Sequence, residues 1–215
     1  MNPAASNINF PAPLAVLAFL GAVGGLFLFL VSAGIAWFAR KPKFAGACVA
    51  IVSGGAAVYL VLLFSFSLAS HTHVLNRGQE KYFCEIDCHL AYSLVDVKTE
   101  PVNGVTHYLV TIRTRFDETT ISLSRPKGVP LTPSPRTIYL ADSTGREYLP
   151  VRVEGTPLLT PLRPSDSYTT QFAFDVPRSE AHSLRLLINT TPSWPDLLVI
   201  GDENSLLHHK TYFSL

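Results

Sequence analysis

The residues best suited to chemistry form the run Cys84-Glu85-Ile86-Asp87-Cys88-His89. Two thiols and an imidazole suit Cu or Zn, and the same two thiols can form a disulfide. On a straight strand Cys84 and Cys88 would lie about 13 Å apart, whereas a disulfide requires Cα atoms within about 7 Å. A bridge therefore requires a turn or bulge between them, which we expect at Ile86-Asp87.

Four interpretations of this run remain open: a Cys84–Cys88 disulfide, buried or free thiols, a metal site that adds His89, and covalently attached haem. Haem attachment normally uses Cys-x-x-Cys-His, which is one residue shorter than the spacing here. Met1 is the only methionine, so no methionine is available as a second axial ligand. We favour the disulfide, because an exported domain permits oxidation, and we predict no bound metal or cofactor.

The remainder of the chain carries no catalytic signature. It has no nucleophile elbow, phosphate-binding loop or metalloprotease helix. Outside the basic run Arg40-Lys41-Pro42-Lys43, 14 Lys and Arg residues stand against 16 Asp and Glu residues. No basic field is available to hold nucleic acid. We therefore expect a protein that is not an enzyme and has no nucleic-acid partner.

Two uncharged apolar runs, Leu14 to Trp37 and Phe44 to Leu68, precede the cysteine region. Each is about 24 residues long, roughly 36 Å as a helix, which is enough to cross a hydrocarbon core of about 30 Å. In lipid the backbone must satisfy its own hydrogen bonds, so both runs should be helical. We predict a transmembrane helical hairpin over residues 14–69. A cleaved signal peptide fits poorly, because the first ten residues contain no Lys or Arg.

The charges of the intervening loop, residues 39–43, predict the orientation of the hairpin. Arg40, Lys41 and Lys43 are its charged residues, and short loops rich in Lys and Arg stay cytoplasmic. The N-terminal tail, residues 1–13, and the C-terminal domain should then lie on the periplasmic side of a bacterial inner membrane. Neither run contains an ionisable side chain of the kind that ion paths and proton relays use, which argues against a channel, pump or transporter.

Small residues recur along both predicted helices at spacings that allow close helix packing. Gly21 and Gly25 lie four apart in the first helix, and Gly46, Ala50 and Gly54 continue the same spacing in the second. They can pack the two helices against each other or against a partner helix, and both interpretations remain open. Membrane lipid and other integral membrane subunits are the partners that this part of the chain predicts.

A polar linker, residues 70–80, leads to residues 81–215, where the hydrophobic period becomes two. Residues 106–116 alternate most clearly, and Asn103-Gly104 before them is a hairpin signal. About seven to nine short strands separated by turn signals predict an antiparallel β-sandwich of immunoglobulin-like type, with a distorted barrel as the alternative. The expected strands begin near residue 81 and continue over 90–99, 106–116, 136–141, 146–151, 167–176, 183–189 and 210–215.

A resemblance to a bacterial family supports the sandwich. The run Pro161 to Asp166, followed by Phe172-Ala173-Phe174-Asp175-Val176-Pro177, resembles a pattern in uncharacterised, membrane-anchored, telokin-like extracytoplasmic domains of immunoglobulin fold. In that pattern a Leu-x-Pro-Gly turn precedes a strand ending in Phe-Asp-Val-Pro, and Ser165 stands where the pattern prefers Gly. The resemblance covers about a quarter of residues 81–215 and implies a binding or structural role.

The order of the parts, two helices and then an outer β-domain, resembles cytochrome oxidase subunit II. That family binds dinuclear copper through Cys-x-Glu-x-Cys-x3-His. Here Ile86 occupies the Glu position and Tyr92 the His position, so the resemblance extends to the topology alone. It suggests a bioenergetic host, either a respiratory or a photosynthetic assembly. We expect a structural subunit that braces a larger inner-membrane complex; the alternative is a periplasmic metal- or redox-binding protein that uses Cys84, Cys88 and His89.

Overall fold

The computed structural model describes residues 12–83, 89–121 and 128–215, and these divide into two compact units. The first unit contains residues 12–71 together with residues 192–209. The second contains residues 72–191 and 210–215. The predicted domain over residues 81–215 was continuous, whereas in the structure residues 192–209 belong to the helical unit. The predicted linker also differs, because residues 73–75 form a strand of the second unit.

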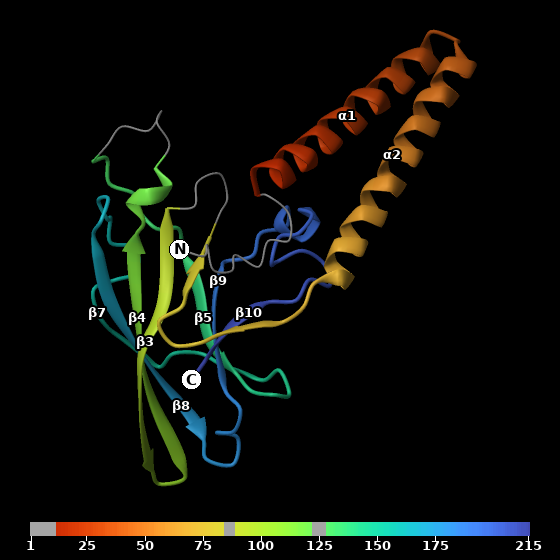
Figure 1. The fold of residues 1–215 in the computed structure, drawn as a ribbon. Coiled ribbons are helices and arrows are strands. Elements are labelled where there is room, and N and C mark those ends of the chain that lie inside the picture. Colours follow the sequence, from red (N-terminus) through yellow and green to blue (C-terminus); the bar gives the residue numbers. More distant parts are fainter. Residues whose placement is uncertain (1–11, 84–88, 122–127) are drawn as a thin grey trace. The chain divides into compact units, whose positions relative to one another are not determined.

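The helical unit is a hairpin of two long helices, α1 (Ala12–Phe38) and α2 (Pro42–Ala69), visible in Figure 1. Both predicted helices are therefore confirmed as helices, within two residues at each end. Pro42 occupies the first turn of α2, where its missing N–H is not needed, and Arg40 reverses the chain with a φ of 56°. Both helices are long and apolar enough to cross a membrane, and most of their side chains are exposed.

Small residues line most of the contact between α1 and α2. A Cβ atom built on Gly55 would lie 3.3 Å from Leu26 Cδ2, so these two residues face each other. In the same antiparallel register, Cys48 lies opposite Ala33 and Ala45 lies opposite Ala36. These four residues are small and buried, and we call them the seam of the hairpin. Small side chains allow the two backbones to approach closely.

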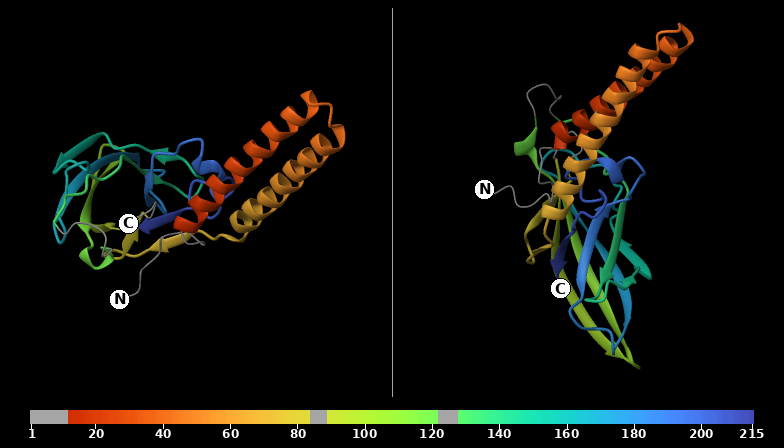
Figure 2. Two further views of the ribbon diagram at one scale, coloured as in Figure 1. Left: turned by 90° about the horizontal axis from the view of Figure 1, so that it is seen from above. Right: turned by 90° about the vertical axis from the view of Figure 1, so that its right-hand side faces the viewer.

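The second unit contains two five-stranded sheets, which Figures 1 and 2 show facing each other. Within the described residues, every strand pair is antiparallel except β1 with β10. One sheet has the order β1 (His73–Leu75), β10 (Thr211–Ser214), β9 (Arg185–Thr190), β5 (Arg136–Ala141) and β6 (Glu147–Tyr148). The other has the order β2 (Glu80–Tyr82), β3 (Leu90–Val102), β4 (Val105–Phe116), β8 (Ser167–Pro177) and β7 (Arg152–Gly155).

The core lies between these sheets and follows the predicted alternation. On β4 the side chains of Val110, Ile112 and Phe116 are fully buried, as expected for one face of residues 106–116. They belong to one cluster with Leu186 and Ile188 of β9 in the facing sheet. Two sheets that share an apolar core are consistent with the predicted β-sandwich.

One predicted strand, residues 146–151, is wrong as a single element. Its first half forms β6, whereas the chain after Pro150 forms β7 in the other sheet. Proline lacks the N–H that a ladder needs, so the strand ends there. Val151 N then donates to Ala173 O at 2.8 Å, which begins the pairing with β8.

Two turns explain local sequence choices. Asn103 and Gly104 have φ values of 49° and 83°, as a two-residue hairpin between β3 and β4 requires. Ser165 has a φ of 72°, in the left-handed region that glycine adopts without strain. This is the position where the resembling bacterial pattern prefers Gly.

Candidate functional site

A network of charged side chains lies on the outer face of the sheet that contains β2, β3 and β4. Tyr82 of β2, Ala91 of β3 and Arg115 of β4 occupy one cross-strand row, and Glu80 precedes Tyr82 by two positions on the same face. Ala91 carries only a methyl group. The long side chains of the two flanking strands therefore meet above β3.

Arg115 is the centre of this network. Its Nε and Nη2 atoms donate to the two carboxylate oxygens of Glu80, each at 2.7 Å, and Nη2 also lies 3.3 Å from Asp117 Oδ2. Tyr82 Oη donates to Asp117 Oδ2 at 2.6 Å. The other oxygen of Asp117 accepts from Thr119 N at 3.0 Å. The bidentate geometry makes this a strong and directional ion pair.

The network fixes the charge of each of its members. Burial opposes ionisation of Asp117, but hydrogen bonds from Tyr82, Thr119 and Arg115 outweigh it and lower its pKa to about 2. The hydrogen bond from Arg115 lowers the pKa of Glu80. Burial and the bond to Asp117 raise the pKa of Tyr82, and the bond to Glu80 raises the pKa of Arg115. None of these four groups is therefore poised to exchange a proton near neutral pH.

The low pKa of Asp117 predicts a dependence of stability on pH. A carboxyl with a lowered folded pKa stabilises the fold above its unfolded pKa of 3.8, and this stabilisation is lost as the pH falls to about 2. We expect Asp117→Asn to lower the free energy of unfolding at pH 7 by about 2 kcal/mol and to flatten its change between pH 4 and pH 2. Urea unfolding of the full chain in detergent measures both. Asp96→Asn, at an exposed ion pair, is the control and should change little.

His89, the described member of the predicted Cys-Cys-His group, is buried beside this network. The Thr120 hydroxyl donates its proton to Asp117 O at 2.7 Å, so Thr120 Oγ1 accepts from His89 Nδ1 at 2.6 Å. The His89 proton is thereby assigned to Nδ1. The imidazole stacks on Phe116 with ring centroids 5.3 Å apart, and His89 is 1% exposed. The histidine is thus held by β4 and by the turn that follows it.

Cys84 and Cys88 lie outside the described residues, so the predicted disulfide between them stays a prediction. The described chain on both sides of this segment is firmly held, by Tyr82 before it and by His89 after it. Among the described residues, no group of three or more His, Cys, Asp or Glu side chains could hold a metal ion. The metal site at Cys84, Cys88 and His89 includes two residues outside the described chain, so it also stays a prediction.

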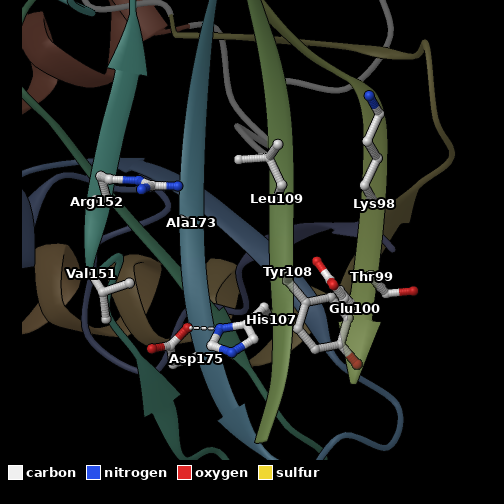
Figure 3. Close-up of a pocket in the computed structure, with 10 residues that line it drawn as sticks. All are labelled: Lys98, Thr99, Glu100, His107, Tyr108, Leu109, Val151, Arg152, Ala173 and Asp175. Atoms are coloured by element: carbon white, nitrogen blue, oxygen red, sulfur yellow. Dashed lines mark hydrogen bonds and ion pairs between the residues drawn. The ribbon is translucent and has the colours of Figure 1, made fainter. Parts of the chain in front are cut away.

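An open groove of about 750 Å³ lies on the outer face of the same sheet, toward the β3–β4 hairpin (Figure 3). Lys98, Leu109, Ala173 and Arg152 form one cross-strand row through β3, β4, β8 and β7. Ala173 is the smallest of the four, and the hollow forms around it. Figure 3 shows Arg152 extending toward β8 at the level of Ala173.

The next row of the groove carries opposite charges. His107 Nδ1 and Asp175 Oδ1 lie 2.6 Å apart on neighbouring strands, and Figure 3 shows the two side chains pointing toward each other. Glu100 lies opposite His107 on the other side. Both His107 and Asp175 are substantially exposed. A shallow groove with both signs of charge suits contact with a polar protein surface better than enclosure of a small substrate.

The predicted helix-packing residues do not form the seam of the hairpin. Gly21, Gly46, Ala50 and Gly54 are exposed, and Gly25 is half-buried. A Cβ atom added at any of these glycines would meet nothing within 4 Å. The interpretation in which they pack against a partner helix stays a prediction.

Sequence reasoning identified only part of the network. The predicted alternation over residues 106–116 puts Arg113 and Arg115 on the face opposite Val110 and Ile112, and the structure places them there. Their partner Glu80 fell in the predicted linker and was missed, because a three-residue strand gives almost no periodic signal. The groove was missed as well, since Lys98, His107 and Asp175 come together only through a register that spans three strands.

Comparison with known proteins gives little further guidance. No family model and no curated protein matches the chain. Among solved structures, the chain is similar to an uncharacterised β-sandwich protein from Clostridium difficile 630, with 9% sequence identity and a TM-score of 0.37. The match covers 68% of this chain and 97% of that one. A likeness of this degree carries no argument about family or function.

Proposed function

We propose that this chain is a membrane-anchored interaction subunit without enzymatic activity. The hairpin of α1 and α2 crosses a bacterial inner membrane, and the β-sandwich, of immunoglobulin-like type, lies on the periplasmic side. The observation that carries this proposal is the exposure of two long apolar helices along nearly their whole length, with Lys43 in the first turn of α2 as their one charged residue. Surfaces of this size and polarity are stable in lipid and would associate in water.

The charges at the tip of the hairpin support the orientation. Arg40 and Lys41 are exposed between the helices, Lys43 is exposed in the first turn of α2, and no acidic residue accompanies them. Short loops of this kind remain in the cytoplasm. The sandwich, with the groove around Ala173, then faces the periplasm.

The outer face of α2 supports a role inside a larger complex. Gly46, Ala50 and Gly54 lie one turn apart and are exposed, whereas Ala45 and Cys48 are buried against α1. Lipid chains need no such row of small residues, but a partner helix does, because small residues let two backbones approach. The open groove of the sandwich offers a second, polar contact outside the bilayer. Together they fit a subunit that braces an inner-membrane assembly.

The charge network is consistent with a structural role for the sandwich. Glu80, Arg115 and Asp117 neutralise one another, and their shifted pKa values keep them ionised across the neutral range. Such a group stiffens the strands that carry it but supplies no base or nucleophile. The alternative function, a metal or redox centre at Cys84, Cys88 and His89, predicts bound metal and a visible spectrum in the purified protein.

The proposal predicts that a bulky residue on the outer face of α2 disrupts the complex. The full chain, purified in mild detergent from its native membrane, should migrate well above its monomer mass of 23.5 kDa with stoichiometric partner subunits. Ala50→Leu should shift it to the monomer, because Leu separates the helix backbones. Val49→Leu, also exposed on α2 but outside the row of small residues, should leave the complex intact. A wild-type monomer free of partners would contradict the proposed role.

A further inference from the structure

Residues 192–209 lie in the sequence between β9 and β10, yet they form one compact unit with the two helices. Tyr59 Oη donates to Leu198 O at 2.7 Å, which joins the segment to the middle of α2. His209 N donates to Ser70 Oγ at 2.9 Å, which joins its end to the C-terminus of α2. The segment is therefore held along α2 by hydrogen bonds at Leu198, in its first half, and at His209, its last residue.

These contacts give the depth that the segment reaches beside the hairpin. Tyr59 precedes Ala69, the last residue of α2, by ten positions, which is about 15 Å along the helix axis. Tyr59 follows Phe44, where the apolar run begins, by 15 positions or about 22 Å. An apolar layer of about 30 Å that starts at Phe44 would extend past Tyr59. Leu198 consequently meets α2 at a level within the outer half of that layer.

An ordinary surface loop exposes charged side chains, whereas this segment exposes large apolar ones and keeps its acidic side chains at least partly buried. Its exposed side chains include four large apolar ones, Trp194, Leu197, Leu206 and Leu207, of which Trp194 is 72% exposed. None of its acidic side chains is exposed. Asp196 Oδ2 accepts from Ser193 N at 2.7 Å, and Asp202 Oδ1 accepts from Asn204 N at 2.7 Å. These two carboxylates thus accept hydrogen bonds from backbone N–H groups of the segment, while the apolar side chains are exposed.

The backbone of the segment makes its own hydrogen bonds, as a layer poor in water requires. Ten of its N–H groups donate to acceptors within the segment or to Ser70. One of these bonds, from Leu206 N to Leu197 O at 3.0 Å, brings three exposed leucines to the same edge. Irregular backbone is tolerated at membrane depth only where its polar groups are satisfied in this way.

Leu207 adds an observation of its own. Its φ is 64°, in a region that a bulky residue rarely adopts, and its side chain is 64% exposed. In water, exposing this leucine gives no favourable free energy that could offset the cost of the strained backbone. Burial of the side chain in an apolar medium would offset that cost.

We propose that residues 192–209 insert into the outer interfacial layer of the bilayer beside α2, with their four exposed apolar side chains against lipid. This inference rests on the proposed membrane anchor and adds a third membrane contact to the two helices. Lipid is the partner favoured over protein, because the segment is bonded to α2 at Leu198 and exposes leucines and a tryptophan but no acidic side chain. Trp194 suits this place, since tryptophan concentrates at the boundary between hydrocarbon and water.

The two tryptophans of the chain, Trp37 and Trp194, allow a direct test. The full chain is reconstituted in phosphatidylcholine vesicles with and without bromine on the acyl chains. Trp37→Phe leaves Trp194 as the reporter of the segment, and Trp194→Phe leaves Trp37, at the end of α1, as the reporter of the hairpin. We expect the brominated lipid to quench both tryptophans to a comparable degree and aqueous iodide to have little effect on Trp194.

The outcomes separate the inference from the anchor on which it rests. Quenching of Trp37 without quenching of Trp194, with Trp194 open to iodide, would overturn the lipid contact and leave the anchor standing. Absence of quenching at both positions would overturn both. In the Trp37→Phe protein, Leu207→Asp should reduce the quenching of Trp194, because a carboxylate is costly in the apolar layer. Leu149→Asp, at a similarly exposed leucine of the sandwich, should not.

Discussion

Replacing Lys81 with methionine is expected to lower the free energy of unfolding of the sandwich by about 4 kcal/mol, since two charge-assisted hydrogen bonds are lost. Lys81 lies on β2, is 1% exposed, and donates from Nζ to Ile188 O at 2.7 Å and to Thr211 O at 3.2 Å. These carbonyls belong to β9 and β10 of the facing sheet. The ammonium group thus connects the two sheets through the core.

Methionine preserves most of the volume of lysine but donates no hydrogen bond, so the two buried carbonyls would lose a donor. Urea or thermal unfolding of the full chain in detergent measures the loss. Lys98→Met, at an exposed lysine of β3, is the matched control and should change the stability by no more than about 0.5 kcal/mol. Equal stability of the two variants would contradict the assigned role of Lys81.

Replacing Arg115 with methionine is expected to cost about 3 kcal/mol, because it leaves Glu80 and Asp117 as partly buried carboxylates without their cation. Both bonds from Arg115 to Glu80 are 2.7 Å long, and the Asp117 side chain is only 7% exposed. Arg152→Met is the control. Arg152 also contacts a carboxylate, Glu154 at 2.8 Å, but on an exposed strand, where such pairs contribute at most about 1 kcal/mol.

A second substitution separates the loss of the ion pair from a general defect in packing. If the cost of Arg115→Met comes from uncompensated charge, adding Glu80→Gln should restore part of the stability. A double variant that is less stable than Arg115→Met alone would show that packing of the arginine stem dominates. Unfolding at pH 7 and at pH 2.5 distinguishes the two cases again, since protonation of the carboxylates removes the charge imbalance at low pH.

Local patterns in the sequence were sufficient to predict several helices and strands of the fold. Composition alone located α1 and α2, alternation located β4 and its buried face, and Asn103-Gly104 located the hairpin before it. Each of these depends on neighbours in the chain. The parallel pairing of β1 with β10 could not be found in this way, because it joins strands of three and four residues from distant parts of the sequence.

The candidate sites depended on tertiary contacts and were therefore only partly predictable. A lysine on a short strand is expected to face solvent. Lys81 instead points into the core, where its ammonium group donates hydrogen bonds to two backbone carbonyls of the facing sheet. Residues 192–209 lie between the expected strands 183–189 and 210–215, but their association with α2 rests on individual hydrogen bonds such as the one from Tyr59 Oη to Leu198 O. The seam of the hairpin is formed by Ala33, Ala36 and their partners rather than by the more conspicuous glycines.

The account depends most on the bilayer separating the basic loop from the sandwich, and labelling of native lysines tests this directly. A membrane-impermeant amine reagent is applied to spheroplasts and to inverted vesicles, and modified residues are identified by peptide mass spectrometry. Lys41, Lys43 and Lys98 are all exposed in the structure. We predict modification of Lys98 but not of Lys41 or Lys43 in spheroplasts, and the opposite in inverted vesicles. Modification of all three in the same preparation, or of the loop lysines alone in spheroplasts, would contradict the proposed anchor and its orientation.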